Sequence, residues 1–211
     1  VNAPQLKSQR ITALHEDRAG VLWIATETGE ISCLQDGKFH AFDDSEEEEI
    51  YSLYADTRGY LWTGGANGAR RYKLSENHQK AGIQSFERVT TPADDKSPKQ
   101  ISTIIETSDG DIWLNNSATT LEKPSRILRW RENAPIEVFD FSNYLKQSTG
   151  FFISDIAASK RDLWVAERSG LYRFDGIRFI KELEISNNAA TNTKFTRDLD
   201  GTLLANLDDG I

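Results

Sequence analysis

The feature that most constrains this chain is a motif that recurs along it. The segments ITALHEDRAGVLW, IYSLYADTRGYLW, ISTIIETSDGDIW and ISDIAASKRDLW each run from an isoleucine to a tryptophan, ending at Trp23, Trp62, Trp113 and Trp164. A fifth, degenerate copy, NTKFTRDLDGTLLANLDDG, has Leu204 at the tryptophan position. Tandem repeats with a period of about 40 to 50 residues indicate a propeller or a solenoid.

Each repeat has the pattern of four short strands. The first repeat holds four runs rich in β-branched and aromatic residues, at 11–16, 21–26, 30–35 and 38–42. Asp36-Gly37 joins the last two runs, and the same dipeptide recurs at Asp175-Gly176. Asp-Gly favours two-residue hairpins, in which both central residues take positive φ. No segment has a helical period, which argues against a helical solenoid. The sequence therefore predicts an all-β fold, a β-propeller of four-stranded antiparallel blades.

The tryptophans occupy strands that are apolar on both faces, such as VLWIA and YLWTG. A strand needs two apolar faces only when other sheets cover it on both sides. We therefore predict that Trp23, Trp62, Trp113 and Trp164 are wedges between neighbouring blades. Small residues that follow three of them would let the next blade approach closely; they are Ala25, Gly64 and Ala166. An aromatic cage that stacks on a ligand is the alternative.

The composite pattern I-x-x-L-x-x-D-x-x-G-x-L-W-x-x-T-x-x-G-x-x-x-x-x-x-D-G-x-F resembles the two-component regulator propeller repeat. Residues 11–39 follow it over nearly their whole length, and RSGLYRFDGIRF, from Arg168, resembles its second half. The third copy carries an insertion, and the fourth replaces the Asp-x-x-Gly turn with SKRD. The resemblance implies a seven-bladed propeller. In this family such propellers form the sensor region of membrane-bound histidine kinases, hybrid two-component sensors or diguanylate cyclases.

A seven-bladed ring would need roughly 300 residues at this period. We therefore expect residues 1–211 to be a single propeller region that forms a partial segment, about 4.5 blades, of a longer ring. The blades are expected at approximately 10–45, 50–92, 100–142, 152–184 and, incomplete, 192–211. A small closed ring of four or five blades is the alternative.

The charge and the cysteine and histidine content of the chain argue against several classes of function. The net charge is −8, and six acidic residues gather in DDSEEEE, from Asp43 to Glu49, which we expect to be a solvated loop. An acidic balance argues against nucleic-acid binding, which needs Lys and Arg to neutralise phosphates. The single cysteine, Cys33, excludes an internal disulfide and is expected to behave as a small apolar residue. The three histidines lack metal-ligand spacing, so no metal or cofactor is expected.

Candidate site residues follow each tryptophan by two to five positions, where loops would converge on one rim of a propeller. Those singled out as ligand-binding are Thr26, Glu27, Asn67, Asn115, Asn116, Glu167 and Arg168, with Gly65 beside them. Thr and Asn also commonly satisfy turn backbones, which is the alternative role. The pair Arg70-Arg71 is expected at a strand edge against the acidic loop. LRWREN, around Trp130, alternates apolar and charged residues and predicts a half-exposed outer strand.

By resemblance, the chain is the extracytoplasmic, periplasmic sensor segment of a bacterial inner-membrane two-component protein, and it is not itself an enzyme. The resemblance also implies a small-molecule ligand, for which the family suggests a carbohydrate. It further implies pairing with a second propeller in a homodimeric receptor. The kinase or cyclase module and any membrane span would lie outside these residues, which contain no run of 18 apolar positions. Two alternatives remain: a propeller lyase or glycoside hydrolase, for which His15 is the histidine of interest, and a protein-interaction scaffold.

Overall fold

The computed structural model describes residues 6, 8, 10–42, 48–75, 83–89, 100–117, 125–140, 153–160, 162–167, 170–185, 193–198 and 200–206. These residues form strands and turns, and none of them is helical. The chain divides into two compact units, one of Val1–Ala93 with Lys99–Ile104 and one of Asp94–Pro98 with Ile105–Ile211.

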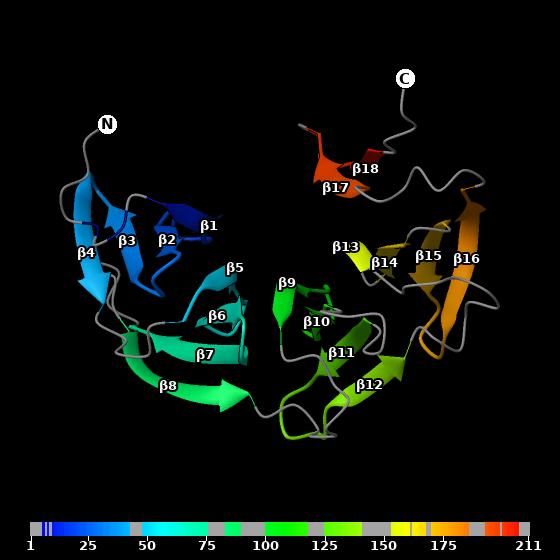
Figure 1. The fold of residues 1–211 in the computed structure, drawn as a ribbon, viewed down its shortest axis with the longest axis horizontal. Helices are drawn as coiled ribbons and strands as arrows, with labels where there is room; N and C mark the ends of the chain where they lie inside the picture. The colour runs from blue at the N-terminus through cyan, green and yellow to red at the C-terminus, as the bar shows by residue number, and fades with distance from the viewer. Residues whose placement is uncertain are drawn as a thin grey trace. The chain divides into compact units, whose positions relative to one another are not determined.

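The first unit contains two four-stranded sheets, each a meander in chain order (Figure 1). The first sheet is β1 (Ile11–Glu16), β2 (Leu22–Thr26), β3 (Ile31–Gln35) and β4 (Lys38–Phe42). The second is β5 (Ile50–Ala55), β6 (Tyr60–Gly65), β7 (Gly68–Leu74) and β8 (Ile83–Val89). All neighbouring strands in both sheets are antiparallel.

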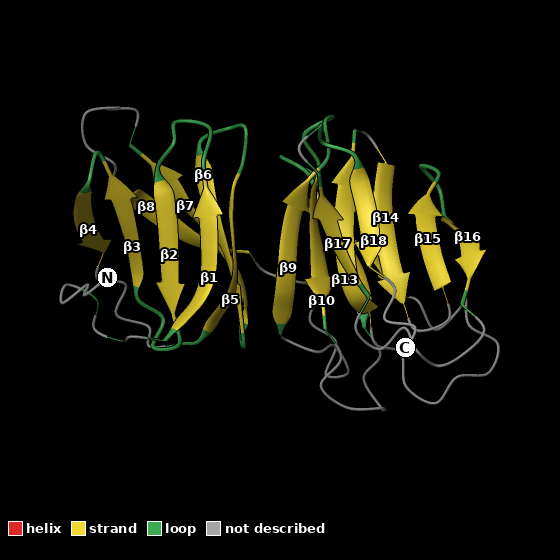
Figure 2. Ribbon diagram, turned by 90° about the horizontal axis from the view of Figure 1, so that it is seen from above, coloured by secondary structure: helices red, strands yellow, loops and turns green. Residues whose placement is uncertain are grey.

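The same meander recurs further along the chain. The third sheet is β9 (Ile101–Glu106), β10 (Ile112–Asn116), β11 (Arg126–Trp130) and β12 (Glu137–Asp140). The fourth is β13 (Ile153–Ser159), β14 (Asp162–Glu167), β15 (Gly170–Phe174) and β16 (Phe179–Glu184). A two-stranded sheet follows, of β17 (Lys194–Arg197) and β18 (Leu203–Asn206). Figure 2 shows the strands joined by turns at both ends of the sheets. The all-β class and the four-stranded antiparallel sheets are thus confirmed.

An aspartate holds the turn between the first two strands and also the tryptophan that follows. In the first sheet, Asp17 Oδ1 accepts the backbone N–H groups of Ala19 (2.9 Å) and Val21 (3.0 Å). Its other oxygen, Oδ2, accepts the indole N–H of Trp23 at 2.9 Å. One carboxylate therefore fixes the turn and the orientation of the buried ring together, which explains the spacing of six residues between them.

The second sheet repeats this arrangement atom for atom. Asp56 Oδ1 accepts the N–H groups of Arg58 and Tyr60, both at 2.9 Å, and Oδ2 accepts the indole N–H of Trp62 at 2.8 Å. In the third sheet a threonine takes the same role, because Thr107 Oγ1 accepts the indole N–H of Trp113 at 3.2 Å. A hydroxyl thus replaces the carboxylate where the sequence has TSDG instead of Asp-x-x-Gly.

The bond to the indole has no counterpart in the last two copies. The fourth copy has no acceptor side chain six residues before its tryptophan, and the fifth copy has no tryptophan. The turn of the fourth copy is one residue shorter, since Ser159 pairs directly with Asp162, and Ala158 stands six residues before Trp164. In the fifth copy, Asp198 Oδ1 still accepts the N–H of Thr202 at 2.9 Å, but the indole position holds Leu204.

The tryptophans that have this partner are buried: Trp23, Trp62 and Trp113 are 1%, 0% and 2% exposed. Trp23 belongs to a core that also contains Leu61 and Tyr72 of the second sheet, so it lies between two sheets. Trp113 likewise meets the fourth sheet, and its ring lies 5.0 Å from Phe174, edge to face. The wedge role is confirmed for these two; Trp164, by contrast, is only partly buried.

The small residue after the tryptophan has the expected role in the second sheet. A Cβ built on Gly64 would lie 2.7 Å from Ile101 Cγ2 and 2.8 Å from the Ile101 carbonyl oxygen. Both distances are shorter than side chains tolerate, so only glycine permits this approach. In the third sheet the same position holds Asn115, whose Nδ2 donates to the carbonyl of Ile153 at 3.4 Å. The contact between sheets is there polar instead of steric.

A row of arginines opposite the tryptophans was not anticipated from the sequence. The strand registers pair Trp62 with Arg71, Trp113 with Arg129 and Trp164 with Arg173, whereas Trp23 pairs with Cys33. Burial raises the pKa of the Cys33 thiol to about 11. In the third sheet the guanidinium of Arg129 stacks 5.2 Å from the Trp113 ring centroid.

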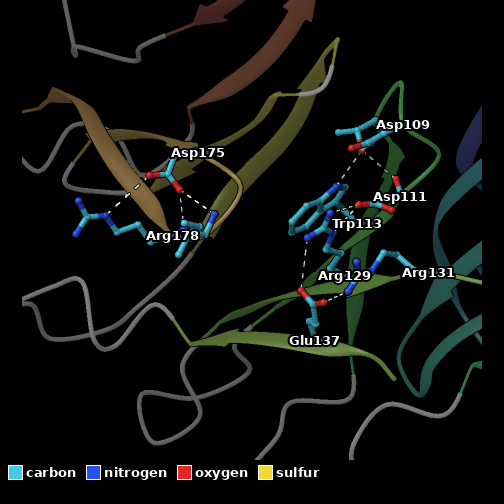
Figure 3. A network of polar contacts seen from close by, with 10 residues as sticks. Asp109, Asp111, Trp113, Arg129, Arg131, Glu137, Asp175 and Arg178 are labelled. Carbon is cyan, nitrogen blue, oxygen red and sulfur yellow. Dashed lines mark hydrogen bonds and ion pairs between the residues drawn. The ribbon is translucent and has the colours of Figure 1, made fainter. Parts of the chain in front are cut away.

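Figure 3 shows the acidic partners of this third-sheet arginine. Arg129 Nε donates to Asp111 Oδ2 at 2.6 Å, and its Nη1 lies 3.6 Å from Glu137 Oε2. Glu137 comes from β12, on the other side of β11. The expectation of an outer strand around Trp130 was therefore wrong: β11 pairs with strands on both sides, and the charged residues that alternate along it are paired inside the sheet.

The two Asp-Gly dipeptides form different turns. Asp36 and Gly37 have φ of 50° and 74° and close the predicted two-residue hairpin between Gln35 and Lys38. The second dipeptide opens a longer loop, because Phe174 pairs with Phe179 and Asp175 Oδ1 accepts the N–H groups of both Ile177 and Arg178. Those bonds hold the pKa of Asp175 below its usual range.

Replacing Asp56 with alanine removes three charge-assisted hydrogen bonds, and we expect it to lower the free energy of unfolding by about 2–4 kcal/mol. Asp198→Ala is the matched control, because the same turn there is exposed and has no indole to hold; we expect a loss below about 1 kcal/mol. Urea unfolding followed by fluorescence measures both. Equal losses would contradict the assigned role of the aspartate.

Candidate functional site

Most of the predicted rim residues lie inside the protein. Thr26, Asn115, Asn116 and Glu167 are between 0% and 2% exposed. They end the second strand of the first, third and fourth sheets, as the sequence indicated. Arg168 lies outside the described residues. As buried polar groups these four are placed to satisfy neighbouring hydrogen-bonding groups, and a ligand cannot reach them without displacing the structure around them.

Two of the buried residues make structural contacts. Thr26 Oγ1 lies 3.0 Å from Thr28 Oγ1, and the Thr26 carbonyl accepts the N–H of Gly29, which closes the turn between β2 and β3. Asn115 bonds to the neighbouring sheet through Nδ2, while its Oδ1 accepts no hydrogen bond from the described part of the chain.

Two rim residues that are not buried, Glu27 and Asn67, pair with the segment that precedes the first strand of their own sheet. In the first sheet, Glu27 Oε2 accepts a bond from Arg10 Nη1 at 2.9 Å, and Glu27 Oε1 accepts one from Ser8 Oγ at 3.1 Å. In the second sheet, Asn67 Nδ2 donates to Glu48 Oε1 at 2.7 Å. The segment before each first strand is thus held against the turn between the second and third strands.

The second sheet has a hollow of about 320 Å³ at this rim. Its lining comes from three places: the segment before β5, the turn between β6 and β7, and the end of β8. The lining residues are Glu48, Glu49, Ile50, Thr63, Gly65, Asn67, Gly68, Ala69, Arg70, Arg88 and Val89. Asn67 and Gly65 were predicted at the site from the sequence, whereas Glu48 and Arg88 were not.

Glu48 connects two sides of this hollow. One carboxylate oxygen accepts the Asn67 amide, and the other accepts Arg70 Nη2 at 2.8 Å. The Arg70 side chain is 9% exposed and that of Glu48 is 28% exposed. Of the arginine pair expected against the acidic run, Arg70 makes this contact, at Glu48, whereas Arg71 donates to Glu87 of β8. The expected strand edge was wrong, because β7 pairs with β6 and with β8. Residues 43–47 of that run lie outside the described residues.

The backbone of the hollow is closely packed. A Cβ on Gly65 would lie 2.6 Å from the Glu49 carbonyl oxygen, so the chain before β5 touches the β6–β7 turn directly. Burial, with a hydrogen bond to Glu49, raises the pKa of Tyr51. The walls of the hollow are thus fixed by backbone contact and by paired side chains, which is the kind of preformed site that small ligands use.

A second hollow, of about 590 Å³, lies beside Trp164. Apolar side chains of Leu171, Phe195 and Leu203 line it together with Asp200 and Thr202. Hydrogen bonds from the hydroxyl and the backbone N–H of Thr202 hold the pKa of Asp200 at about 2. The described part of the fifth sheet has only two strands, and this leaves Trp164 less covered than the other landmark tryptophans.

His15 lies in β1, and its ring centroid is 5.0 Å from that of Tyr54. Burial lowers the pKa of His15, so the ring is neutral at physiological pH. Its contact with Tyr54 gives it a packing role between two sheets. Within the described residues, no group of three or more His, Cys, Asp or Glu side chains is placed to hold a metal ion.

No helix in the described part of the chain has the length and apolarity needed to span a membrane.

The family described as "Two component regulator propeller" matches the sequence at residues 5–28. Residues 5–28, which hold the first copy of the tryptophan motif, therefore match a repeat of this family, and the resemblance drawn from the motif is confirmed there. No curated protein matches the sequence.

Solved structures with the same fold include a virginiamycin B lyase from Staphylococcus aureus, with a TM-score of 0.69 and 19% identity over 94% of this chain and 63% of that one. The extracellular domain of a putative hybrid two component system from B. thetaiotaomicron also has a TM-score of 0.69, with 20% identity over 97% of this chain and 27% of that one. A structure of YCF48 bound to D1 peptide has a TM-score of 0.57, with 13% identity over 87% of this chain and 56% of that one.

These likenesses show the propeller fold, which an enzyme, a sensor domain and a peptide-binding protein share. The chain spans less than two thirds of the length of each of these three proteins. Function therefore has to be argued from the site, because one fold hosts many functions.

The Glu48–Arg70 pair should contribute more to stability than its counterpart in the first sheet. In a double-mutant cycle with Glu48→Gln and Arg70→Gln we expect a coupling energy of about 1–2 kcal/mol, because the arginine is nearly buried. The pair of Arg10 and Glu27 is 70% and 36% exposed, and its coupling should fall below about 0.5 kcal/mol. Equal couplings, measured by urea unfolding, would contradict a preorganised hollow.

Proposed function

We propose that this chain is part of the sensor propeller of a membrane-bound two-component signalling protein, and that it binds a small polar ligand outside the cytoplasm without catalysing a reaction. The observation that carries this proposal is the hollow of the second sheet. A buried arginine, a carboxylate and an amide line its volume of about 320 Å³. The family match and the likeness to the extracellular domain of a hybrid two-component protein support the sensor role.

The chemistry of the hollow favours binding over catalysis. General acid–base catalysis needs a group that is free to exchange a proton with the substrate. Glu48 is instead held by hydrogen bonds from Asn67 and Arg70 to its two carboxylate oxygens. His15, the histidine considered for an enzyme, does not line this hollow.

A ligand that binds the rim changes signalling only if the signalling states of the receptor bind it differently. In the family, propellers adjoin one another in a homodimeric receptor, and ligand binding would alter how they pair. Carbohydrate remains the ligand that the resemblance implies. The hollow supplies both donors and acceptors, as a hydroxyl-rich ligand would require.

The test uses the intact receptor with a transcriptional or cyclase reporter, whichever output module it carries. We expect Asn67→Ala and Arg70→Gln to lower the ligand response at least tenfold, since each removes a side chain that lines the hollow. Arg58→Gln is the control, because Arg58 lies in the β5–β6 turn at the other end of the same sheet.

Asn67→Ala keeps the test decisive even where Arg70→Gln weakens folding, because Asn67 is exposed. A normal response from a folded Asn67→Ala receptor would overturn the assignment of the hollow. Turnover of a polymeric or cyclic substrate by the purified chain would instead favour an enzyme of the lyase type.

A further inference from the structure

The turn between β6 and β7 contains the only Asn-Gly dipeptide of the sequence, Asn67-Gly68. Gly65 pairs with Gly68 across this turn, so Ala66 and Asn67 are its two central residues, and Asn67 is exposed. Gly68 has a φ of 114°, a conformation that residues with a side chain rarely adopt. The fold therefore requires glycine directly after an exposed asparagine.

An asparagine followed by glycine can lose its side-chain amide without an enzyme. The backbone nitrogen of Gly68 attacks Cγ of Asn67 and forms a C–N bond, and Nδ2 leaves as ammonia with the proton of the Gly68 amide. Water then opens the resulting succinimide at either carbonyl, which leaves an aspartate or an isoaspartate at position 67. Glycine favours the attack because it has no Cβ to crowd the nitrogen and its backbone rotates freely. The net charge of the chain becomes one unit more negative than −8.

The amide that would leave is hydrogen-bonded in the structure. Asn67 Nδ2 donates to Glu48 Oε1 at 2.7 Å, and the other oxygen of Glu48 accepts Arg70 Nη2 at 2.8 Å. Glu48 lies in the segment before β5, so this bond restrains the rotation that brings Asn67 Cγ to the Gly68 nitrogen. After conversion, position 67 carries a carboxylate in place of the donor. Two carboxylates at such a distance repel each other, so the bond to Glu48 is lost.

We propose that Asn67 is a site of spontaneous deamidation, that its bond to Glu48 slows the reaction, and that conversion breaks the contact between the β6–β7 turn and the segment before β5. The modification goes beyond the proposed sensor function and needs no ligand. Since Asn67 also lines the hollow of the second sheet, an aged chain has a rim of different charge from that of a new one.

Peptide mass spectrometry of the purified 211-residue chain, incubated at mildly alkaline pH, measures the conversion of each asparagine. We expect Asn67 to convert at least about tenfold faster than Asn133, which is also exposed in a turn but precedes an alanine. Asn67→Gln is the matched control, because the longer side chain must close a larger ring; we expect it to keep its amide over the same period. Equal rates at Asn67 and Asn133 would overturn the assignment of the site.

The restraint by Glu48 is tested with Glu48→Ala, which removes the acceptor of the Asn67 amide. We expect conversion of Asn67 to become roughly three- to tenfold faster, because a charge-assisted hydrogen bond no longer holds the side chain. Glu27→Ala, at the same rim of the first sheet, should leave the rate unchanged. An unchanged or slower rate in Glu48→Ala would contradict the restraint. An equal acceleration at Asn133 would also contradict it, since the whole fold would then have loosened.

Asn67→Asp reproduces one product of the reaction and tests its consequence. Double-mutant cycles with Glu48→Ala, measured by urea unfolding against Asn67→Ala, give the coupling between positions 48 and 67. We expect a favourable coupling for asparagine and an unfavourable one for aspartate, which added salt should weaken because it screens exposed charges. A favourable coupling for aspartate would overturn the claim that conversion breaks this contact.

Discussion

The hydrogen bond between a turn side chain and the indole six residues later is the interaction on which the first three blades depend. Asp17 and Asp56 satisfy two turn amides with one oxygen and hold a tryptophan with the other. An indole N–H buried without a partner would oppose folding, because unpaired buried polar groups are costly. This bond lets a large ring fill the space between sheets without an unsatisfied donor. At Trp164, for which the described residues provide no such acceptor, the ring is less buried.

The candidate rim lies at the opposite ends of these strands from the aspartate turns. There the segment before the first strand meets the turn between the second and third strands, through Arg10 and Glu27 in one sheet and Glu48 and Asn67 in the next. Both sheets make this contact, but the glutamate lies in the turn in the first sheet and in the preceding segment in the second. A repeat can therefore keep its fold while its rim changes chemistry; in the described strands of the second sheet, Arg70 lies opposite Arg88.

The repeated motif was sufficient to predict the blades, because strand period, turn residues and tryptophan spacing are all local signals. The rim was less predictable. Thr26 and Glu167 lie where the spacing placed them but are buried, and burial depends on packing between sheets, which spacing does not report. The pairing of Arg70 with Arg88 depends on the register of β8, which follows a long connection. An aligned search for arginine nine residues after tryptophan would have found Arg71 and Arg173.

Hydrogen exchange at the indole nitrogens tests the central claim most directly. NMR of the 211-residue chain, with each signal assigned by a Trp→Phe variant, measures the exchange rate of every indole N–H. The account predicts that Trp23, Trp62 and Trp113 exchange at least about a hundredfold more slowly than Trp164, because opening must first break the bond to Asp17, Asp56 or Thr107. Similar rates for Trp62 and Trp164 would contradict it.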